Sequence, residues 1–271
     1  MKIMDNRPIG IFDSGIGGLT VLQEVIEQFP NEEIIYFGDT ARIPYGTKSK
    51  EAVIRYSFQC IRFLLSKDVK MIVIACNTAS AVALEPALKE FDIPILGVIE
   101  AGAKAAVKGT LNEKVGVIGT TGTINSNAYQ KAIRNMSPAA EVIGQACPLF
   151  VQIVEDGWED TEVAMLTAEK YLIDMKEHDV DTLVLGCTHY PILRYTLRKV
   201  LGEDVVLVNP AYETAKEARE ILTERKLLTE RTDMPKVEFF VSDDAEKFRR
   251  IGGNMLNRNI DSVKKIDIEK L

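Results

Sequence analysis

Two cysteines lie at corresponding places in the sequence, each at the end of a short apolar stretch. Cys76 ends "MIVIAC" and is followed by "NTAS", whereas Cys187 ends "LVLGC" and is followed by "THYP". Small polar residues directly after a strand are typical of the start of a helix. The partial positive charge of a helix N-terminus lowers the pKa of a nearby thiol below about 8.5. The pattern therefore predicts two reactive thiols, each at the carboxyl end of a strand.

Two thiols in such positions can carry out one particular chemistry. In open parallel sheets, ligands bind beyond the carboxyl ends of the strands. If Cys76 and Cys187 face each other across a cleft, they flank a bound carbon atom from opposite sides. One thiolate then removes a proton from its face of the carbon, and the other thiol delivers a proton to the opposite face. This arrangement inverts a stereocentre.

The other cysteines and histidines carry weaker signals. Cys60 lies on the apolar face of an expected helix, and Cys147 is followed by proline and apolar residues, so both are expected to be structural. The sequence has no Cys-x-x-Cys pair and only two histidines, which argues against a metal site. We expect no metal and no cofactor. His178, in a charged run, is expected on the surface, whereas His189 is close enough to Cys187 to assist proton transfer.

A glycine-rich turn, "DSGIGG", follows the first expected strand. It lacks the third glycine of a dinucleotide fingerprint and the lysine of a phosphate loop. Its N–H groups could still bind a small anion. Asp13 at its start suits an ammonium group, or influences the protonation of a thiol; the alternative is a helix cap in a tight turn.

Two further turns are expected at the same edge. "PYGT" spans Pro44 to Thr47, and "TTGT", Thr120 to Thr123, brings hydroxyls from the other half of the chain, with Thr120 and Thr121 as candidate substrate contacts. Glu155 could support the site from behind, but it belongs to a charged run, which is typical of a solvent-exposed face.

The elements that must position these residues alternate between strands and helices, which indicates an α/β fold. Strand-like segments at 8–12, 34–39, 71–76 and 94–99 recur in the same order about 106 to 111 residues later. This repetition predicts an internal duplication. We expect two similar α/β domains, each a mostly parallel sheet flanked by helices, related by a pseudo-two-fold axis with the active site in the cleft between them.

The predicted division assigns 1–98 and 208–271 to the first domain and 99–207 to the second. The C-terminal segment belongs to neither repeat and is expected to return to the first domain. No stretch of the sequence has the length of a membrane span, and the first residues lack the apolar run of a signal peptide. These features favour a cytoplasmic protein with reduced cysteines and no membrane partner.

Composition narrows the partners further. The 271 residues include 40 acidic and 33 basic ones, for a net charge of −7. Nucleic acid is therefore a disfavoured partner, because the chain has no overall positive field to attract a polyanion. A small anionic substrate would have to be held by local hydrogen-bond donors.

With these residues assembled, the chain resembles the glutamate racemases, cofactor-independent bacterial enzymes that supply D-glutamate for peptidoglycan. The resemblance covers nearly the whole chain. It is carried by the segments "GIFDSGIGGLTV", "YFGDTARIPYG", "ACNTASA", "GVIGTTGT" and "GCTHYPIL".

The resemblance implies roles for individual residues. Cys76 and Cys187 would be the acid/base thiols, and glutamate the substrate. The implied substrate contacts come in pairs along the chain: Asp13 and Ser14, Tyr45 and Gly46, Asn77 and Thr78, Thr188 and His189. The family also implies a homodimer.

Two alternatives stay open. The aspartate racemases share the two-cysteine layout but tend to carry an acidic residue where this chain has His189. A flavodoxin-like pair of domains that binds a nucleotide or metabolite without chemistry would explain the sheets and glycine-rich turns. It would leave the paired thiols as a coincidence.

Overall fold

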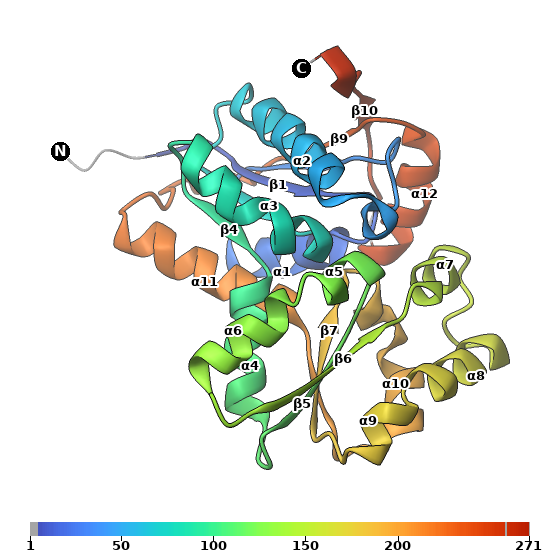
Figure 1. Ribbon diagram of the computed structural model, residues 1–271. Helices are drawn as coiled ribbons and strands as arrows, with labels where there is room; N and C mark the ends of the chain where they lie inside the picture. The colour runs from blue at the N-terminus through green and yellow to red at the C-terminus, as the bar shows by residue number, and fades with distance from the viewer. Residues whose placement is uncertain (1–4, 258, 271) are drawn as a thin grey trace.

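The computed structural model describes residues 5–257 and 259–270, in which two parallel sheets lie one above the other (Figure 1). The first sheet has six strands in the order β10-β9-β2-β1-β3-β4, and the second has four in the order β6-β5-β7-β8. The strands of the first sheet are β1 Ile9–Asp13, β2 Ile34–Gly38, β3 Met71–Ile74, β4 Ile95–Gly97, β9 Val237–Val241 and β10 Val263–Lys265. Those of the second are β5 Lys114–Gly119, β6 Glu141–Ala146, β7 Thr182–Gly186 and β8 Val206–Val208.

Both sheets repeat one order of strands. The order β2-β1-β3-β4 in the first sheet has the same connectivity as β6-β5-β7-β8 in the second. Central strands such as β1 "IGIFD" and β7 "TLVLG" are buried along their whole length. Strands buried on both faces are characteristic of parallel sheets covered by helices on each side. The predicted two-part α/β fold is therefore confirmed.

Helices cover each sheet on both faces. One face of the first sheet packs against α1, α11 and α12, and the other against α2 and α3. One face of the second packs against α4 and α6, and the other against α7 to α10. The helices around the first sheet are α1 Leu19–Gln28, α2 Lys50–Leu65, α3 Asn77–Glu90, α11 Pro210–Glu224 and α12 Ala245–Met255. Those around the second are α4 Ile99–Gly109, α5 Thr121–Asn125, α6 Ala128–Met136, α7 Leu149–Glu155, α8 Glu162–Tyr171, α9 Ile173–Glu177 and α10 Arg194–Leu201.

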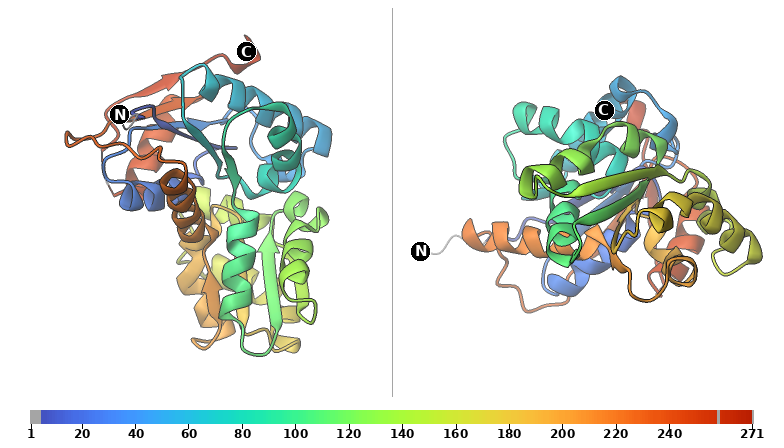
Figure 2. Two further views of the ribbon diagram at one scale, coloured as in Figure 1. Left: turned by 90° about the vertical axis from the view of Figure 1, so that its left-hand side faces the viewer. Right: turned by 60° about the horizontal axis from the view of Figure 1, so that its bottom comes forward.

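The chain crosses between the sheets twice. It leaves the first sheet through β4 into α4, and it returns from β8 through α11, which packs against both α1 and α4 (Figure 2). β9 then pairs with β2, and β10 pairs with β9. The C-terminal segment therefore extends the first sheet, while the domain boundaries near 98 and 208 stay a prediction. None of the described helices is both long enough and apolar enough to span a bilayer.

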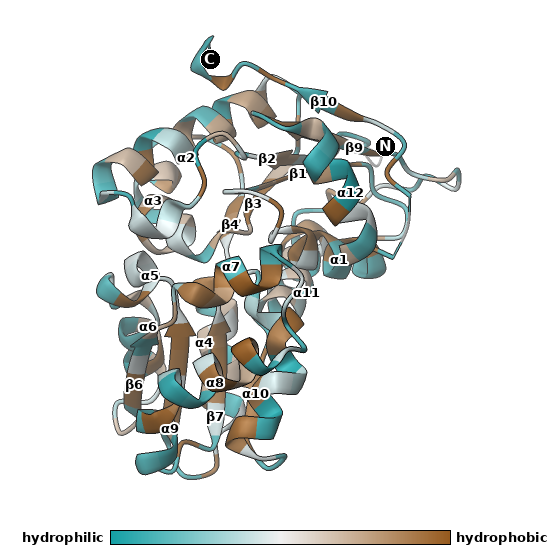
Figure 3. Ribbon diagram, turned by 90° about the vertical axis from the view of Figure 1, so that its right-hand side faces the viewer, coloured by the Kyte–Doolittle hydropathy of each residue, from teal (hydrophilic) through white to brown (hydrophobic). Residues whose placement is uncertain are grey.

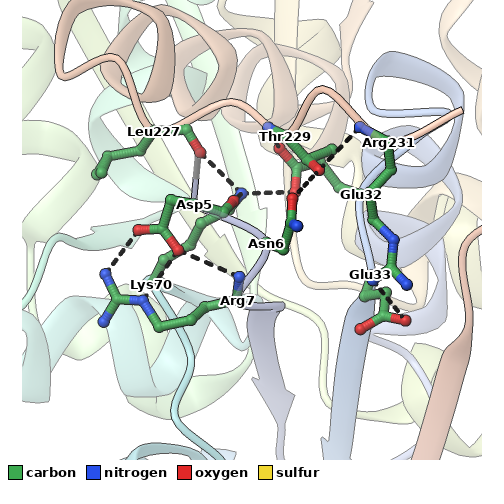
Figure 4. Close-up of polar contacts among 9 residues, drawn as sticks. All are labelled: Asp5, Asn6, Arg7, Glu32, Glu33, Lys70, Leu227, Thr229 and Arg231. Atoms are coloured by element: carbon green, nitrogen blue, oxygen red, sulfur yellow. Dashed lines mark hydrogen bonds and ion pairs between the residues drawn. The ribbon is translucent and has the colours of Figure 1, made fainter. Parts of the chain in front are cut away.

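A buried ion pair ties this returning segment to the first sheet, at the end opposite the thiols (Figure 4). Lys70 lies just before β3 and is fully enclosed, and Glu32 is 3% exposed. The Lys70 ammonium donates to Glu32 at 2.6 Å and to the carbonyl oxygens of Asp5 and Leu227, each at 2.8 Å. The other oxygen of Glu32 accepts from the N–H of Thr229 at 2.8 Å. One cation thus joins the N-terminal segment, β3 and the connection from α11 to β9.

We expect Lys70→Met to lower the free energy of unfolding by about 3 kcal/mol, because it leaves the Glu32 carboxylate buried without its countercharge. Urea denaturation monitored by circular dichroism measures the change. Lys89→Met is the matched control, since Lys89 and Glu85 form an exposed pair one helical turn apart, worth about 0.5 kcal/mol or less. Equal losses in the two variants would contradict this account.

Candidate active site

The two thiols predicted from the sequence line one cavity between the two sheets. β3 ends two residues before Cys76, and β7 ends directly before Cys187, so each thiol lies at the carboxyl end of its own sheet. Every other predicted site residue except Asp13 and Thr121 lines the same cavity. These are Ser14, Tyr45, Gly46, Asn77, Thr78, Thr120, Thr188 and His189.

The cavity is narrow. Its volume is about 20 Å³, which is room for about one water molecule. Hydrogen bonds between the two halves close it: Thr20 donates to the Thr188 carbonyl at 3.1 Å, and the hydroxyls of Thr78 and Thr120 are 2.8 Å apart. A cavity of this size is too small for an amino acid, so its walls must move apart before one can bind.

Cys76 occupies the N-cap position of α3, and among the described residues its side chain makes no capping bond. Its Sγ donates instead to Ser14 Oγ at 3.7 Å. Burial and the negative field of Asp13 raise the pKa of Cys76 to about 12, although the N–H of Ala79 opposes them. The predicted lowering of this thiol's pKa is therefore wrong, because desolvation outweighs the charge of the helix end.

Asp13 lies behind the cavity and is completely buried. Its Oδ2 accepts from the N–H groups of Gly15 at 3.1 Å and Gly18 at 3.0 Å, while Oδ1 has no partner among the described residues. Burial raises the pKa of Asp13, although His189 and these N–H groups act in the opposite direction. The close packing of this turn requires glycine at position 18, because a Cβ on Gly18 would lie 2.4 Å from Asp13 Cβ and 2.6 Å from the Tyr36 hydroxyl.

His189 connects the second thiol to a carboxylate. Its Nδ1 is 3.8 Å from Cys187 Sγ, and its Nε2 is 3.2 Å from Glu155 Oε1. Burial alone would lower the pKa of His189, but the contacts with Cys187 and Glu155 and the field of Asp13 raise it to about 10. These contacts favour the imidazolium form of His189, whose positive charge would face the sulfur of Cys187.

The charged run around Glu155 favoured a solvent-exposed position, and the structure corrects this expectation. Its side chain is only 13% exposed, because α7 turns it toward His189. Burial would raise the pKa of Glu155, but the hydrogen bond to His189 lowers it overall, with help from Lys247 of α12, whose Nζ is 3.8 Å from Oε2. The contact of Glu155 with His189 fits the alternative that Glu155 supports the site from behind.

Hydroxyl groups from both halves meet on one side of the cavity. Besides its bond to Thr120, Thr78 is 3.2 Å from the hydroxyl of Thr123. Thr120 caps α5, and the helix then turns Thr121 to the exterior and Thr123 inward. The structure therefore places Thr121 outside the cavity and buries Thr123 beside Thr78 and Thr120.

The Tyr45 hydroxyl points away from the cavity. It donates to the buried Asp39 carboxylate at 2.5 Å, and Arg42 donates to the same oxygen at 2.7 Å. These bonds hold the 3-10 turn Tyr45–Thr47 in place, so the turn offers its backbone to the cavity rather than a phenol. Gly46 is required there, since a Cβ would lie 2.5 Å from Thr120 Cβ.

The remaining cysteines and the second histidine lie elsewhere. Cys60 is completely buried in the core beside the Tyr45 hydroxyl, and Cys147 is completely buried with its Sγ 3.6 Å from the Gln145 carbonyl. All four cysteines are free thiols, and His178 is exposed. Within 5–257 and 259–270, no group of histidine, cysteine or carboxylate side chains is arranged to hold a metal ion.

Comparisons with known proteins agree with this geometry. The family Asp/Glu/hydantoin racemase matches residues 9–218. The glutamate racemase of Geobacter metallireducens is 51% identical, over 97% of each chain. Among solved structures, the glutamate racemase isoform RacE1 of Bacillus anthracis is 42% identical, with a TM-score of 0.94 over 97% of this chain and 98% of that one. The glutamate racemase of Francisella tularensis in complex with D-glutamate is 41% identical, with a TM-score of 0.92 over 99% of this chain and all of the other.

Proposed function

The chain belongs to the Asp/Glu/hydantoin racemase family, and from this premise we infer that it interconverts L- and D-glutamate by proton transfer between Cys76 and Cys187. Relatives that are 43% to 51% identical over nearly the full length are glutamate racemases, which supports glutamate as the substrate. The observation that carries the mechanism is that both thiols line one cavity, each at the carboxyl end of a different sheet.

The reaction needs one base and one acid on opposite sides of the α-carbon. A thiolate removes the α-proton, the carbanion forms, and the opposite thiol donates its proton to the other face of the carbon. In the reverse direction the two sulfurs exchange roles. The reaction neither consumes nor releases a proton overall. At the end of each turnover the thiol and the thiolate have exchanged places, and proton exchange with water restores the starting state of the enzyme.

The α-proton of an amino acid is a far weaker acid than a thiol, so the site must stabilise the carbanion. Hydroxyls and backbone N–H groups of the cavity are suited to hold the carboxylates, including those of Ser14, Asn77 and Thr188. Preorganised donors of this kind contribute about 3 kcal/mol each in a site closed to water. The Asp13 oxygen that has no partner among the described residues is suited to bind the substrate ammonium group. An amino group held in its protonated form makes the α-proton more acidic than it is in the neutral amine.

The two thiols lie beside groups of opposite charge. The carboxylate of Asp13 acts on Cys76, whereas the imidazolium of His189 faces Cys187 at 3.8 Å. We propose that His189 serves as the proton reservoir beside Cys187 and that Glu155 keeps it charged. Cys76 then needs the positive ammonium group of the substrate nearby before it can act as a base.

Glutamate is favoured over the alternatives by specific observations. Aspartate fits less well as the substrate, because His189 occupies the position where an acidic residue is expected in aspartate racemases. A non-catalytic binding module gives no reason for both thiols to line the same cavity. The product fits a supply of D-glutamate for peptidoglycan, and a reducing cytoplasm would preserve the free thiols.

Racemization of each glutamate enantiomer in D2O tests the mechanism. Early in the reaction, the product is expected to carry deuterium at its α-carbon while the remaining substrate carries little, because different groups remove and deliver the proton. Mass spectrometry of the separated enantiomers measures both. Equal labelling of substrate and product from the start would indicate one shared base and overturn the two-thiol mechanism. Aspartate in parallel incubations tests the substrate.

A homodimer is also part of the proposal. Large apolar side chains are exposed on α7 to α10 and on the connection between α7 and α8, elements that lie in the second half of the protein (Figure 3). They are Leu149, Trp158, Val163, Leu166, Ile173 and Tyr195. Burial of such a surface is a common driving force for association. Light scattering of the purified protein measures its mass against that of one chain.

A further inference from the structure

Tyr129 of α6 reaches across from the second half of the protein to the first. Its side chain is 1% exposed, and its hydroxyl donates to Asn77 Oδ1 at 2.7 Å. Asn77 is the residue directly after Cys76, and it lines the cavity. The sequence analysis did not single out Tyr129, and its bond to Asn77 joins residues 52 positions apart.

Two glycines build the slot in which the ring of Tyr129 lies. A Cβ on Gly186 would lie 3.1 Å from one Cε atom of the ring, and a Cβ on Gly102 would lie 3.1 Å from the other. These two atoms flank the carbon that bears the hydroxyl. Gly186 is the last residue of β7, directly before Cys187. The ring of Tyr129 therefore rests against the backbone before one thiol, while its hydroxyl bonds the residue after the other.

The bond also fixes which way the Asn77 amide faces. The Tyr129 hydroxyl has one hydrogen, and Asn77 Oδ1 is the acceptor that the described residues offer it. Burial raises the pKa of Tyr129 far above its usual value of 10, so the phenol keeps that hydrogen at neutral pH. With Oδ1 engaged, the NH2 group of Asn77 is left as a donor, and it has no acceptor among the described side chains and backbone.

We propose that Tyr129 is a positioning residue, which orients the Asn77 amide so that its NH2 group donates to a carboxylate of the substrate when the two halves are closed. The inference rests on the proposed racemization of glutamate. It couples closure of the two halves to orientation of the Asn77 amide, since Tyr129 and Asn77 belong to different halves and their hydrogen bond forms only when the halves meet. Tyr129 itself touches neither the substrate nor a reacting atom.

Tyr129→Phe tests the proposal, because phenylalanine keeps the ring in its slot and removes only the hydroxyl. We expect kcat/KM to fall by about 10- to 100-fold, the effect of losing a hydrogen bond that supports a charged group. The fall must be equal for L- and D-glutamate, because the enantiomers have the same free energy. In the Asn77→Ala background, the same substitution is expected to change kcat/KM by less than about twofold, since the group on which Tyr129 acts is gone.

Tyr190→Phe is the control for stability. Tyr190 is a fully buried tyrosine of the same half, and its hydroxyl donates to the Cys147 carbonyl at 2.8 Å. It should lower the melting temperature about as much as Tyr129→Phe while kcat/KM changes by less than about threefold.

The outcomes separate the two proposals. An unsubstituted enzyme that does not racemize glutamate would refute the proposed function. An active enzyme in which Tyr129→Phe has the same effect with and without the Asn77 side chain would show that Tyr129 acts through general packing, and would overturn the positioning role. Unchanged kcat/KM in Tyr129→Phe alone would overturn it as well.

Discussion

Cys76→Ser and Cys187→Ser are each expected to lower kcat/KM for glutamate racemization by about a thousandfold or more. A serine hydroxyl has nearly the shape of a thiol but is a far weaker acid, so it can neither supply nor accept the proton at a useful rate. Acid–base catalysis by one positioned group typically contributes 10²- to 10⁴-fold. Inversion needs both groups, so either loss stops the full reaction in both directions. A coupled assay for each enantiomer measures the effect.

The two variants should differ in what they retain. A substrate with a good leaving group on its β-carbon can undergo elimination after removal of the α-proton, and this step needs only one thiol. Cys76→Ser and Cys187→Ser are therefore expected to keep elimination from opposite enantiomers. Cys147→Ser is the control, because its buried sulfur contacts the Gln145 carbonyl and not the substrate cavity. Racemization that survives in either catalytic-site variant at a comparable rate would refute the two-thiol mechanism.

Asp13→Asn is expected to lower kcat/KM by about a hundredfold. Asparagine has the same size and can still accept a backbone N–H, so the turn around Gly15 and Gly18 is preserved. The lost charge is the one proposed to pair with the substrate ammonium group, and buried charge-assisted bonds are worth about 1.5–3 kcal/mol. Asp181→Asn is the control, since Asp181 bonds Thr110 and the adjoining turn at the far end of the second sheet.

The same substitution has a predictable effect on Cys76. The negative field of Asp13 raises the pKa of this thiol, so removing the charge must lower it. Alkylation of Cys76 by iodoacetamide, followed by mass spectrometry, should therefore begin at lower pH in Asp13→Asn than in the unsubstituted protein. An unchanged pH profile together with unchanged kcat/KM would show that Asp13 serves only to hold the glycine-rich turn.

The positions of the two thiols could be predicted from the sequence because they depend on local rules. A buried parallel strand appears in a sequence as a short apolar run, and the carboxyl ends of such strands lie at one edge of a sheet. Cys76 and Cys187 each follow such a run, and the repeated spacing placed them in equivalent parts of two sheets. The return of the C-terminal segment followed from its having no counterpart in the repeat.

Properties that depend on distant residues could not be predicted. The pKa of Cys76 is set by burial and by Asp13, 63 positions earlier in the chain, and these reverse the effect expected from the helix end. The sequence around Glu155 is typical of a surface, but α7 turns its side chain toward His189. Thr121 and Thr123 differ only in which way one short turn of α5 points them. Each outcome depends on how strands and helices pack in three dimensions, and the sequence does not encode that locally.

The pairing of β9 with β2 has a consequence for how the protein is made. Ile34 lies opposite Val237, so β2 keeps an open edge until most of the chain has left the ribosome. The second sheet, β5 to β8, needs only residues 114–208 and is complete while the C-terminal strands are still being synthesised. The half that begins first in the sequence is therefore the half that finishes last, and a nascent chain stalled after α11 would expose an unprotected strand to chaperones and to its neighbours.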